Sequence, residues 1–297
     1  GGAARRRPAA GAGGPGAGRH ALALVHHGGE VLALEPATGR VRWRIAWGGG
    51  PAPVWLADDG RRVALATPYR LAVVARGTGQ EKWHWKVNTT SADAATIDPE
   101  VLESVTAWAA SEALVAGATR SGEVRAMRPA DGREAWRART GGGVGLMAAD
   151  DERMVCVRTA GEACEAVVLD AESGRELGRF ALGGGFRPHT AEMTPEGAIV
   201  IAGAGQIAAY ACGASEPLWR WTASGGAAIA GVRMGIGEVY AYGPGFVAAV
   251  SWADGRTKWE KNPFDGEPEA VRQVWSAGGR VYAAGESGVA ALEAETG

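Results

Sequence analysis

The side chains best suited to bind a metal ion are two adjacent histidines, His26 and His27, and two aspartate pairs, Asp58–Asp59 and Asp150–Asp151. Imidazole and carboxylate groups ligate Zn²⁺ and Ca²⁺ when several converge on one point. Adjacent residues of a strand point to opposite faces, so His26 and His27 are poorly placed to chelate one ion. The aspartate pairs precede glycine or charged residues, which is typical of solvated turns. We therefore expect neither a metal site nor catalytic residues here.

Cysteine chemistry and phosphate binding are the next candidates. The three cysteines, Cys156, Cys164 and Cys212, form no Cys-x-x-Cys pair. Buried free thiols are favoured, although a disulfide between Cys156 and Cys164 stays open because both fall on neighbouring strands of one expected sheet. The glycine runs at 141–143 and 183–185 precede neither a helix nor a Lys-Ser/Thr pair, so we interpret them as connectors and not as phosphate loops.

A repeated eleven-residue frame organises the chain. It runs from Ala33 to Trp43, with a small residue first, then an acidic residue, a Thr-Gly turn, and Trp four residues after the glycine. Further copies lie at 73–83, 126–136, 168–178, 209–219 and 249–259, and a half copy lies at 291–297. The turn positions are spaced by 40 to 42 residues, except for one interval of 53. This period, with about four short alternating strands per unit, is typical of propeller blades.

The sequence therefore predicts an all-β fold, a β-propeller of four-stranded antiparallel blades. We expect about seven blades, with an incomplete seven- or eight-bladed ring as the alternative reading of the partial first and last units. Residues 1–19 are rich in Gly, Ala, Pro and Arg and are expected to be a disordered linker. Residues 20–297 are expected to form the propeller, truncated at its last blade. The long interval predicts an insertion at 88–103, on a face that often binds ligands.

The frame assigns structural roles to its tryptophans and glycines. We expect each indole to lie over the peptide of its own turn and over the small residue at the first frame position, while the glycine supplies a positive φ. In the fourth copy Gly178 replaces Trp, and Phe180 is a partial substitute on the same face. In the fifth copy Pro217 falls inside the expected strand, which favours an outermost position. The predicted docking residues are Trp43, Trp83, Trp136, Trp219, Trp259, Gly39, Gly79, Gly132, Gly174 and Gly255.

The frame Ala-x-Asp-x-x-Thr-Gly-x-x-x-Trp resembles the tryptophan-docking motif of the pyrroloquinoline-quinone-like (quinoprotein) β-propellers, over nearly all of the chain after residue 20. That family contains quinone-dependent dehydrogenases, which hold the quinone with a calcium or lanthanide ion. It also contains an outer-membrane assembly lipoprotein and sensor domains of bacterial serine/threonine kinases. The adjacent cysteine pair of some dehydrogenases is absent, and no acid-amide ligand set can be matched. The resemblance thus implies a non-enzymatic member without a cofactor.

The charge and hydropathy of the chain bear on whether nucleic acid or a membrane is an expected partner. The net charge of −2 gives no general reason to expect nucleic acid. The longest apolar run, at 198–211, is too short to span a membrane, so direct insertion is not expected. The chain begins Gly-Gly-Ala without a targeting signal, and the resemblance favours an extracytoplasmic or cell-envelope location. The basic lead-in suits a linker from an upstream kinase or membrane-anchor domain.

A ligand site, where a propeller has one, lies at the mouth of the central channel, which the inner strands line. Polar residues predicted for that position are Arg187, His189, Glu192, Arg233, Arg272 and Gln273. We therefore expect a non-catalytic binding or scaffold module that recognises a protein or peptide, such as a sensor or assembly domain of a bacterial protein. The alternative is a fragment of a divergent quinone-dependent dehydrogenase.

Overall fold

The structure is a computed structural model of the chain. It describes residues 22–27, 29–35, 38–47, 54–58, 61–67, 70–86, 105–160, 163–183, 187–203, 205–264, 270–286 and 288–297. The expected linker at 1–19 and the expected insertion at 88–103 lie outside these residues. The side chains of His26, His27, Asp58 and Asp59 also lie outside them.

The described residues form β-strands joined by turns, together with one short 3-10 helix, η2 (Ser224–Gly226). No helix in this part of the chain has the length and apolar character needed to cross a membrane. The first eleven strands are β1 (Ala23–His27), β2 (Glu30–Leu34), β3 (Val41–Ala46), β4 (Val54–Asp58), β5 (Arg62–Thr67), β6 (Arg70–Ala75), β7 (Glu81–Lys86), β8 (Val105–Ala110), β9 (Val115–Thr119), β10 (Glu123–Met127) and β11 (Glu134–Arg139).

The remaining strands follow in the same rhythm of short strand and tight turn. They are β12 (Val144–Ala149), β13 (Arg153–Ala160), β14 (Ala163–Asp170), β15 (Glu176–Leu182), β16 (Pro188–Met193), β17 (Ala198–Gly203), β18 (Gln206–Ala211), β19 (Trp219–Thr222), β20 (Gly231–Met234), β21 (Glu238–Gly243), β22 (Phe246–Ser251), β23 (Thr257–Lys261), β24 (Gln273–Ala277), β25 (Arg280–Ala284) and β26 (Val289–Glu293).

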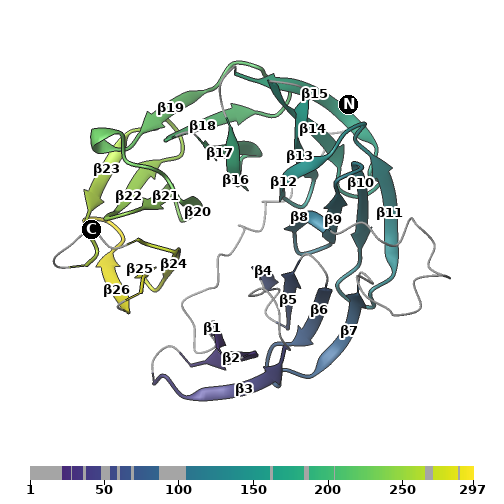
Figure 1. The fold of residues 1–297 in the computed structure, drawn as a ribbon, viewed down its shortest axis with the longest axis horizontal. Helices are drawn as coiled ribbons and strands as arrows, with labels where there is room; N and C mark the ends of the chain where they lie inside the picture. Colours follow the sequence, from purple (N-terminus) through teal and green to yellow (C-terminus); the bar gives the residue numbers. More distant parts are fainter. Residues whose placement is uncertain are drawn as a thin grey trace, which may run out of the picture.

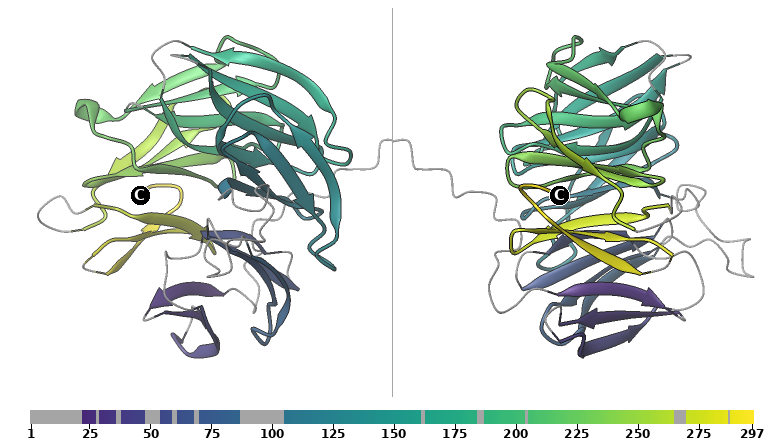
Figure 2. Two further views of the ribbon diagram at one scale, coloured as in Figure 1. Left: turned by 45° about the vertical axis from the view of Figure 1, so that its right-hand side comes forward. Right: turned by 90° about the vertical axis from the view of Figure 1, so that its left-hand side faces the viewer.

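Strands that follow one another in sequence pair antiparallel within each sheet, and no sheet contains a crossover. Five sheets have four strands: β4–β7, β8–β11, β12–β15, β16–β19 and β20–β23. The sheets β1–β3 and β24–β26 have three. Figure 1 shows the sheets fanned one after another about a central axis, with the first strand of each four-stranded sheet innermost and the last outermost. In Figures 1 and 2 the last sheet, in yellow, comes round next to the first, in purple.

The all-β propeller class is therefore confirmed. The expectation of about seven four-stranded blades is too high for the described residues, because only five sheets are complete and the first and last sheets each have three strands. Sheet β1–β3 begins at the second strand position and ends with the outer strand that bears Trp43. Sheet β24–β26 begins at the inner position and ends at the third.

Burial differs between the middle and outer strands of a sheet. Strand β17 is buried at every position after its first, whereas β23 alternates and buries mainly Trp259. The middle strands lie between two neighbouring sheets, so both of their faces are covered, and Ala, Val and Ile fill them. The outer strands have one face in water, so their polar residues alternate with buried apolar or aromatic side chains, such as Trp219 and Trp221 of β19.

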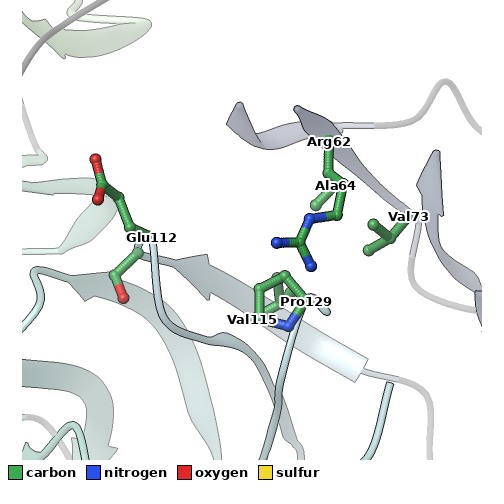
Figure 3. Close-up of a pocket in the computed structure, with 7 residues that line it drawn as sticks. Arg62, Ala64, Val73, Glu112, Val115 and Pro129 are labelled. Carbon is green, nitrogen blue, oxygen red and sulfur yellow. The ribbon is translucent and has the colours of Figure 1, made fainter. Parts of the chain in front are cut away.

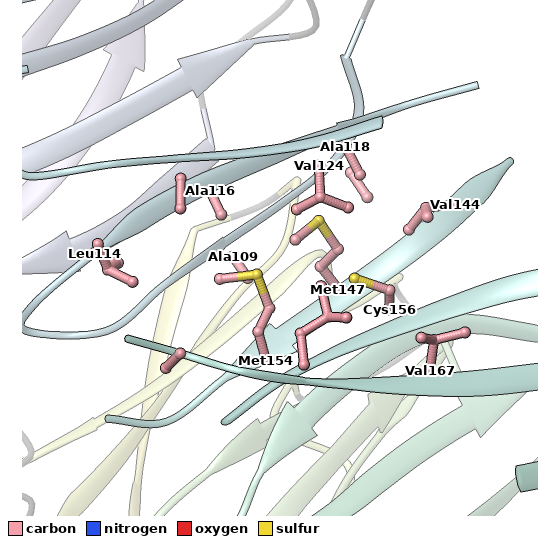
Figure 4. Close-up of a cluster of buried hydrophobic side chains, with 14 of the residues drawn as sticks. Ala109, Leu114, Ala116, Ala118, Val124, Val144, Met147, Met154, Cys156 and Val167 are labelled. Atoms are coloured by element: carbon pink, nitrogen blue, oxygen red, sulfur yellow. The ribbon is translucent and has the colours of Figure 1, made fainter. Parts of the chain in front are cut away.

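The hydrophobic core lies in layers between successive sheets. Figure 4 shows one layer, in which Ala116 and Val124 of sheet β8–β11 meet Met147, Met154 and Cys156 of sheet β12–β15. Methionine adapts its shape to irregular gaps, which suits the space between two twisted sheets. Each layer belongs to two sheets at once, so a sheet is stabilised only beside its neighbours.

The motif tryptophans join each sheet to the next one. The Trp43 indole Nε1 donates a hydrogen bond to the carbonyl oxygen of Arg76, at 2.7 Å, in the turn of the following sheet. A Cβ placed on Gly79 would lie 2.8 Å from the Trp43 ring, so only glycine leaves room for the indole. The expectation that each ring covers its own turn is wrong, because no described atom lies within 4 Å of a Cβ built on Gly39.

Four further indoles repeat this contact, each with the glycine and the carbonyl of the sheet that follows. They are Trp83 with Gly132 and the Pro129 carbonyl (2.9 Å), Trp136 with Gly174 and the Ala171 carbonyl (2.7 Å), Trp219 with Gly255 and the Trp252 carbonyl (2.7 Å), and Trp259 with Gly297 and the Ala294 carbonyl (2.8 Å). The accepting carbonyl always lies three residues before the glycine. One hydrogen bond and one flat apolar contact therefore fix each of these joints.

The fourth and fifth copies depart from the pattern. Gly178 stands opposite Val168 where other copies have Trp, and Phe180 is buried with its ring centroid 6.1 Å from that of Tyr210 in the next sheet. Pro217 was expected inside a strand, but it lies in the loop before β19 (Trp219–Thr222), which is outermost in its sheet. Proline lacks an N–H donor, so the strand begins only after it.

Replacing the turn glycines by alanine separates the indole contact from the backbone effect. Gly79 and Gly39 have nearly equal φ angles, +70° and +68°, but only Gly79 contacts an indole. Gly39→Ala should therefore cost about 1–2 kcal/mol of unfolding free energy for the left-handed backbone alone. Gly79→Ala should cost about 1–3 kcal/mol more, because the methyl group must displace the Trp43 ring. Urea denaturation of both variants measures the difference, and equal losses would contradict the indole contact.

Candidate functional site

The residues predicted for the channel mouth lie on the inner strands of three consecutive sheets. His189 and Glu192 are on β16, Arg233 is on β20, and Gln273 is on β24. Arg187 and Arg272 come directly before β16 and β24. The inner strands surround the central axis in Figure 1, so these six residues belong to one region of the ring.

Two of these residues form an ion pair across neighbouring sheets. The Arg233 Nη1 atom lies 2.7 Å from the Glu192 Oε1 atom, and the side chains are 40% and 25% exposed. Burial raises the pKa of the Glu192 carboxyl, while the charge and hydrogen bond of Arg233 lower it in part. Burial also raises the pKa of the nearby Tyr242 hydroxyl. The pair is a charged contact on the channel wall. The Arg233 charge offsets only part of the free energy that burial costs the ionised Glu192 carboxylate.

The other predicted residues are exposed. Arg187, His189 and Gln273 lie at the surface, and no hydrogen bond or ion pair between described residues joins them to the Glu192–Arg233 pair. Arg272 forms an exposed ion pair with Glu286, which follows β25. The structure therefore brings Glu192 and Arg233 together and leaves the remaining polar groups accessible to a partner. An exposed ion pair contributes little to stability, so the Arg272 pair can open at small cost.

The Glu192–Arg233 contact was not foreseen, although the sequence contained a signal for it. The two residues are 41 positions apart, which is one repeat length. Residues separated by one repeat occupy similar heights on neighbouring inner strands, so opposite charges at that spacing can meet.

The described residues that suggested metal or thiol chemistry, Asp150 and the three cysteines, lie in a turn or are free thiols. The described residues contain no group of three or more His, Cys, Asp or Glu side chains arranged to hold a metal. The Asp150 carboxylate accepts hydrogen bonds from the backbone N–H groups of Glu152 and Arg153, at 2.9 and 2.6 Å, so it shapes a turn. All three cysteines are free. Burial raises the pKa of Cys156 to about 12, which leaves its thiol unreactive near neutral pH.

Two recesses of the described surface are neither deep nor enclosed. Figure 3 shows the first, where the Arg62 side chain extends from sheet β4–β7 towards Pro129 of sheet β8–β11. Val73 and Val115 complete its apolar lining, and the space is barely enough for one water molecule. The second is an open groove with mainly charged walls that include Asp151, Arg153 and Glu172. Neither shape encloses a small organic molecule.

The sheets fanned about an axis, with polar residues on their inner strands, define a β-propeller. A family model described as the outer membrane protein assembly factor BamB matches residues 3–158 and 162–297. The chain therefore belongs to this family of β-propellers with pyrroloquinoline-quinone-like repeats. A comparison with curated protein sequences found no match.

Solved structures with the same fold are distant in sequence. BamB from Moraxella catarrhalis is 16% identical, with a TM-score of 0.58 over 92% of this chain and 81% of that one. The computationally designed Ika8 protein is 14% identical, with a TM-score of 0.56 over 93% and 97%. Chaetomium thermophilum Raptor is 10% identical, with a TM-score of 0.69 over 92% of this chain and 26% of that one. At these identities the likeness concerns the fold alone.

The raised pKa of Glu192 predicts a pH dependence of stability. A carboxyl whose folded-state pKa exceeds its unfolded value stabilises the fold below the unfolded pKa, and this contribution is lost as the pH rises through the folded pKa. Glu192→Gln mimics the neutral form. The Tm of this variant minus that of the wild type should therefore increase from about pH 4 towards neutrality.

Glu176 supplies a control of opposite sign. Hydrogen bonding from Arg179 lowers the pKa of this exposed carboxyl. A lowered folded-state pKa contributes stability above the unfolded pKa that is lost on acidification. The Tm of Glu176→Gln minus that of the wild type should therefore decrease over the same pH range. Thermal melts in which both differences change in the same direction would contradict the assignment for Glu192.

Proposed function

We propose that this chain is a non-catalytic β-propeller module that binds a protein or peptide at the mouth of its central channel. The observation that carries the proposal is a set of accessible polar side chains on or next to the inner strands of three consecutive sheets: Arg187 and His189 at β16, Arg233 on β20, and Gln273 on β24. Strands hold their side chains more precisely than loops, so little ordering entropy is lost when a partner binds.

The composition of the mouth suits a polypeptide partner. Arginine is enriched at protein interfaces, where its planar guanidinium makes several hydrogen bonds at once. Arg187 is exposed, and among the described residues Arg272 pairs with the exposed carboxylate of Glu286, which a carboxylate of a partner can replace. The Glu192–Arg233 pair joins the inner strands β16 and β20 and presents a fixed dipole on the same wall.

Membership of the BamB family supports the same proposal. The matching family is described as an outer membrane protein assembly factor, and such a role involves contact with other proteins. By this analogy we place the chain outside the cytoplasm, as a sensor or assembly domain of a bacterial protein. Attachment to an upstream kinase or membrane anchor stays a prediction from the composition of residues 1–19.

Site-specific photo-crosslinking in cells of the source organism tests the proposal. A photoreactive residue at His189 or Gln273 should capture one defined protein. The same residue at Arg256, exposed on the outer turn of sheet β20–β23, should not capture it. Arg187→Glu should reduce the yield at His189 about tenfold, because it reverses a charge at the mouth. Equal capture at His189 and Arg256 would contradict a partner site at the mouth.

The absence of catalysis is tested separately, because the fold also serves quinone-dependent dehydrogenases. The purified protein is titrated with pyrroloquinoline quinone and calcium, while the quinone absorbance and the reduction of an artificial dye are followed in the presence of alcohols and sugars. We expect neither a saturable change in absorbance nor dye reduction. Saturable binding with alcohol-dependent dye reduction would establish the dehydrogenase instead.

A further inference from the structure

The Glu192–Arg233 pair occupies a position that the preceding sheets fill with alanine. The register of the paired strands places both residues level with the first residue of the frame, Ala209 for Glu192 and Ala249 for Arg233. The inner-strand residues at this level are Ala57, Ala109 and Ala148 in the three preceding sheets and Trp275 in sheet β24–β26. Two charged side chains therefore stand where the earlier sheets have a small apolar residue.

The packing of the ring does not require this charged pair. Ala109 and Ala148 are buried at the same level, so a small residue suffices to close the wall between neighbouring sheets. A carboxylate taken out of water costs free energy that its ion pair repays only in part. Positions where a protein departs from the stable local choice are commonly functional sites. The pair therefore points to recognition of a ligand by the channel wall.

Arg233 is the member of the pair that is open to a ligand. Its side chain is 40% exposed, and its hydrogen bond to Glu192 uses the Nη1 atom. A guanidinium group carries five N–H donors in a planar fork, which matches the two oxygens of a carboxylate. Arg233 can therefore bind a second carboxylate that approaches through the channel.

The charge of Glu192 depends on Arg233. Strands β12 and β17, which pack against β16, contain no titratable side chain. Strand β20 contributes Arg233, and β21 contributes Tyr242, whose hydroxyl lies over Gly231. Burial raises the pKa of Glu192, and Arg233 opposes this shift. A ligand that draws Arg233 away therefore favours protonation of Glu192.

We propose that Arg233 binds a side-chain carboxylate of an acidic segment of the partner, and that Glu192 releases Arg233 and takes up one proton from water as this segment binds. One carboxylate thus replaces another on the guanidinium, and the displaced Glu192 becomes neutral. The inference rests on the proposed protein-binding function and names the chemistry of the partner and its dependence on pH.

The partner is assigned an acidic segment because the region carries several arginines. Arg187 and Arg272 come directly before β16 and β24, and Arg233 lies on β20 between them. Arg272 already pairs with a carboxylate, that of Glu286. A chain terminus supplies one carboxylate, whereas a run of Asp or Glu side chains supplies one for each guanidinium.

A labelled peptide of four Gly-Glu repeats with blocked ends is the probe, and fluorescence anisotropy measures its binding. The peptide carboxylates, with an ordinary pKa of about 4.3, stay ionised between about pH 5.5 and 7.5. Binding that takes up a proton strengthens as the pH falls, here by up to about tenfold per pH unit. Saturable binding with this pH dependence is expected.

Two further peptides identify the chemical group that is recognised. A blocked peptide of four Gly-Gln repeats lacks carboxylates and should bind at least about tenfold more weakly. A glycine peptide with a free C-terminal carboxylate should also bind at least about tenfold more weakly, because it engages one guanidinium. Equal binding of the Gly-Gln peptide, or of the glycine peptide, would overturn the assignment to an acidic segment.

Three variants locate the proton. Glu192→Gln is permanently neutral, so it should bind the Gly-Glu peptide more tightly than the wild type at pH 7.5 and lose the pH dependence. Glu176→Gln, which changes an exposed carboxyl on β15, is the matched control and should keep it. His189 on β16 bears an imidazole that also gains charge on acidification, and His189→Asn should keep the pH dependence as well. Loss of the pH dependence in His189→Asn, or its persistence in Glu192→Gln, would contradict the role of Glu192.

The role of Arg233 needs a variant that leaves no uncompensated charge. Arg233→Gln alone removes the counter-charge of Glu192, so the substitution is made together with Glu192→Gln. The double variant should melt as cooperatively as Glu192→Gln and bind the Gly-Glu peptide at least about tenfold more weakly than that variant. Equal affinities of the two would show that Arg233 does not bind the carboxylate.

The photo-crosslinking experiment separates this inference from the proposed function. If a photoreactive residue at His189 captures a partner while the Gly-Glu peptide fails to bind, the channel-mouth function stands and the acidic segment is wrong. If the peptide binds with the expected pH dependence and His189 captures no protein, the carboxylate site stands and the proposed function is contradicted.

Discussion

The fold depends on a single contact between neighbouring sheets, in which an indole ring lies on a glycine and donates a hydrogen bond to the carbonyl three residues earlier. The contact requires three residues at once: a tryptophan on one outer strand, a glycine without Cβ, and a small residue opposite the tryptophan. Because the partners lie one repeat apart, five of the sheets are each fixed to the sheet that follows. The repeated frame is therefore the consequence of an interaction between units, and the middle strands can be built from small apolar residues.

Much of this architecture could be predicted from the sequence, because the frame recurs at nearly constant intervals and its alternating strands have no helical period. The glycine that each indole contacts could not be predicted from the sequence. Spacing along the chain relates Trp43 to Gly39, four residues away, whereas the fold joins it to Gly79 in the next sheet. The spacing of residues along the chain gives the local geometry of a turn. Which turn an indole reaches in the next sheet depends on how the two sheets twist and pack against each other. The proline before β19 was misplaced for a simpler reason, since strand boundaries are poorly defined by composition.

The polar residues of the inner strands were predicted as a group, but their interactions depend on the ring. The charged pair Glu192–Arg233 joins positions one repeat apart, so the periodicity already contained it, whereas the exposed pair Arg272–Glu286 forms around a single hairpin. The binding surface that we propose at the channel mouth therefore consists of polar side chains held on or next to inner strands of neighbouring sheets.

The joint between β12–β15 and β16–β19 differs from the five indole joints. Gly178 replaces the tryptophan there, and Phe180 and Tyr210 contribute rings within a layer that also contains Ile199 and Ile201. Phenylalanine has no N–H group, so the indole hydrogen bond of the other five joints is absent here. Two other hydrogen bonds cross the seam instead: Arg153 donates to the Gly197 carbonyl at 3.2 Å, and the Gly183 N–H donates to the Tyr210 hydroxyl at 3.4 Å. A joint of the ring can therefore dispense with the indole when apolar packing and hydrogen bonds from other residues replace it.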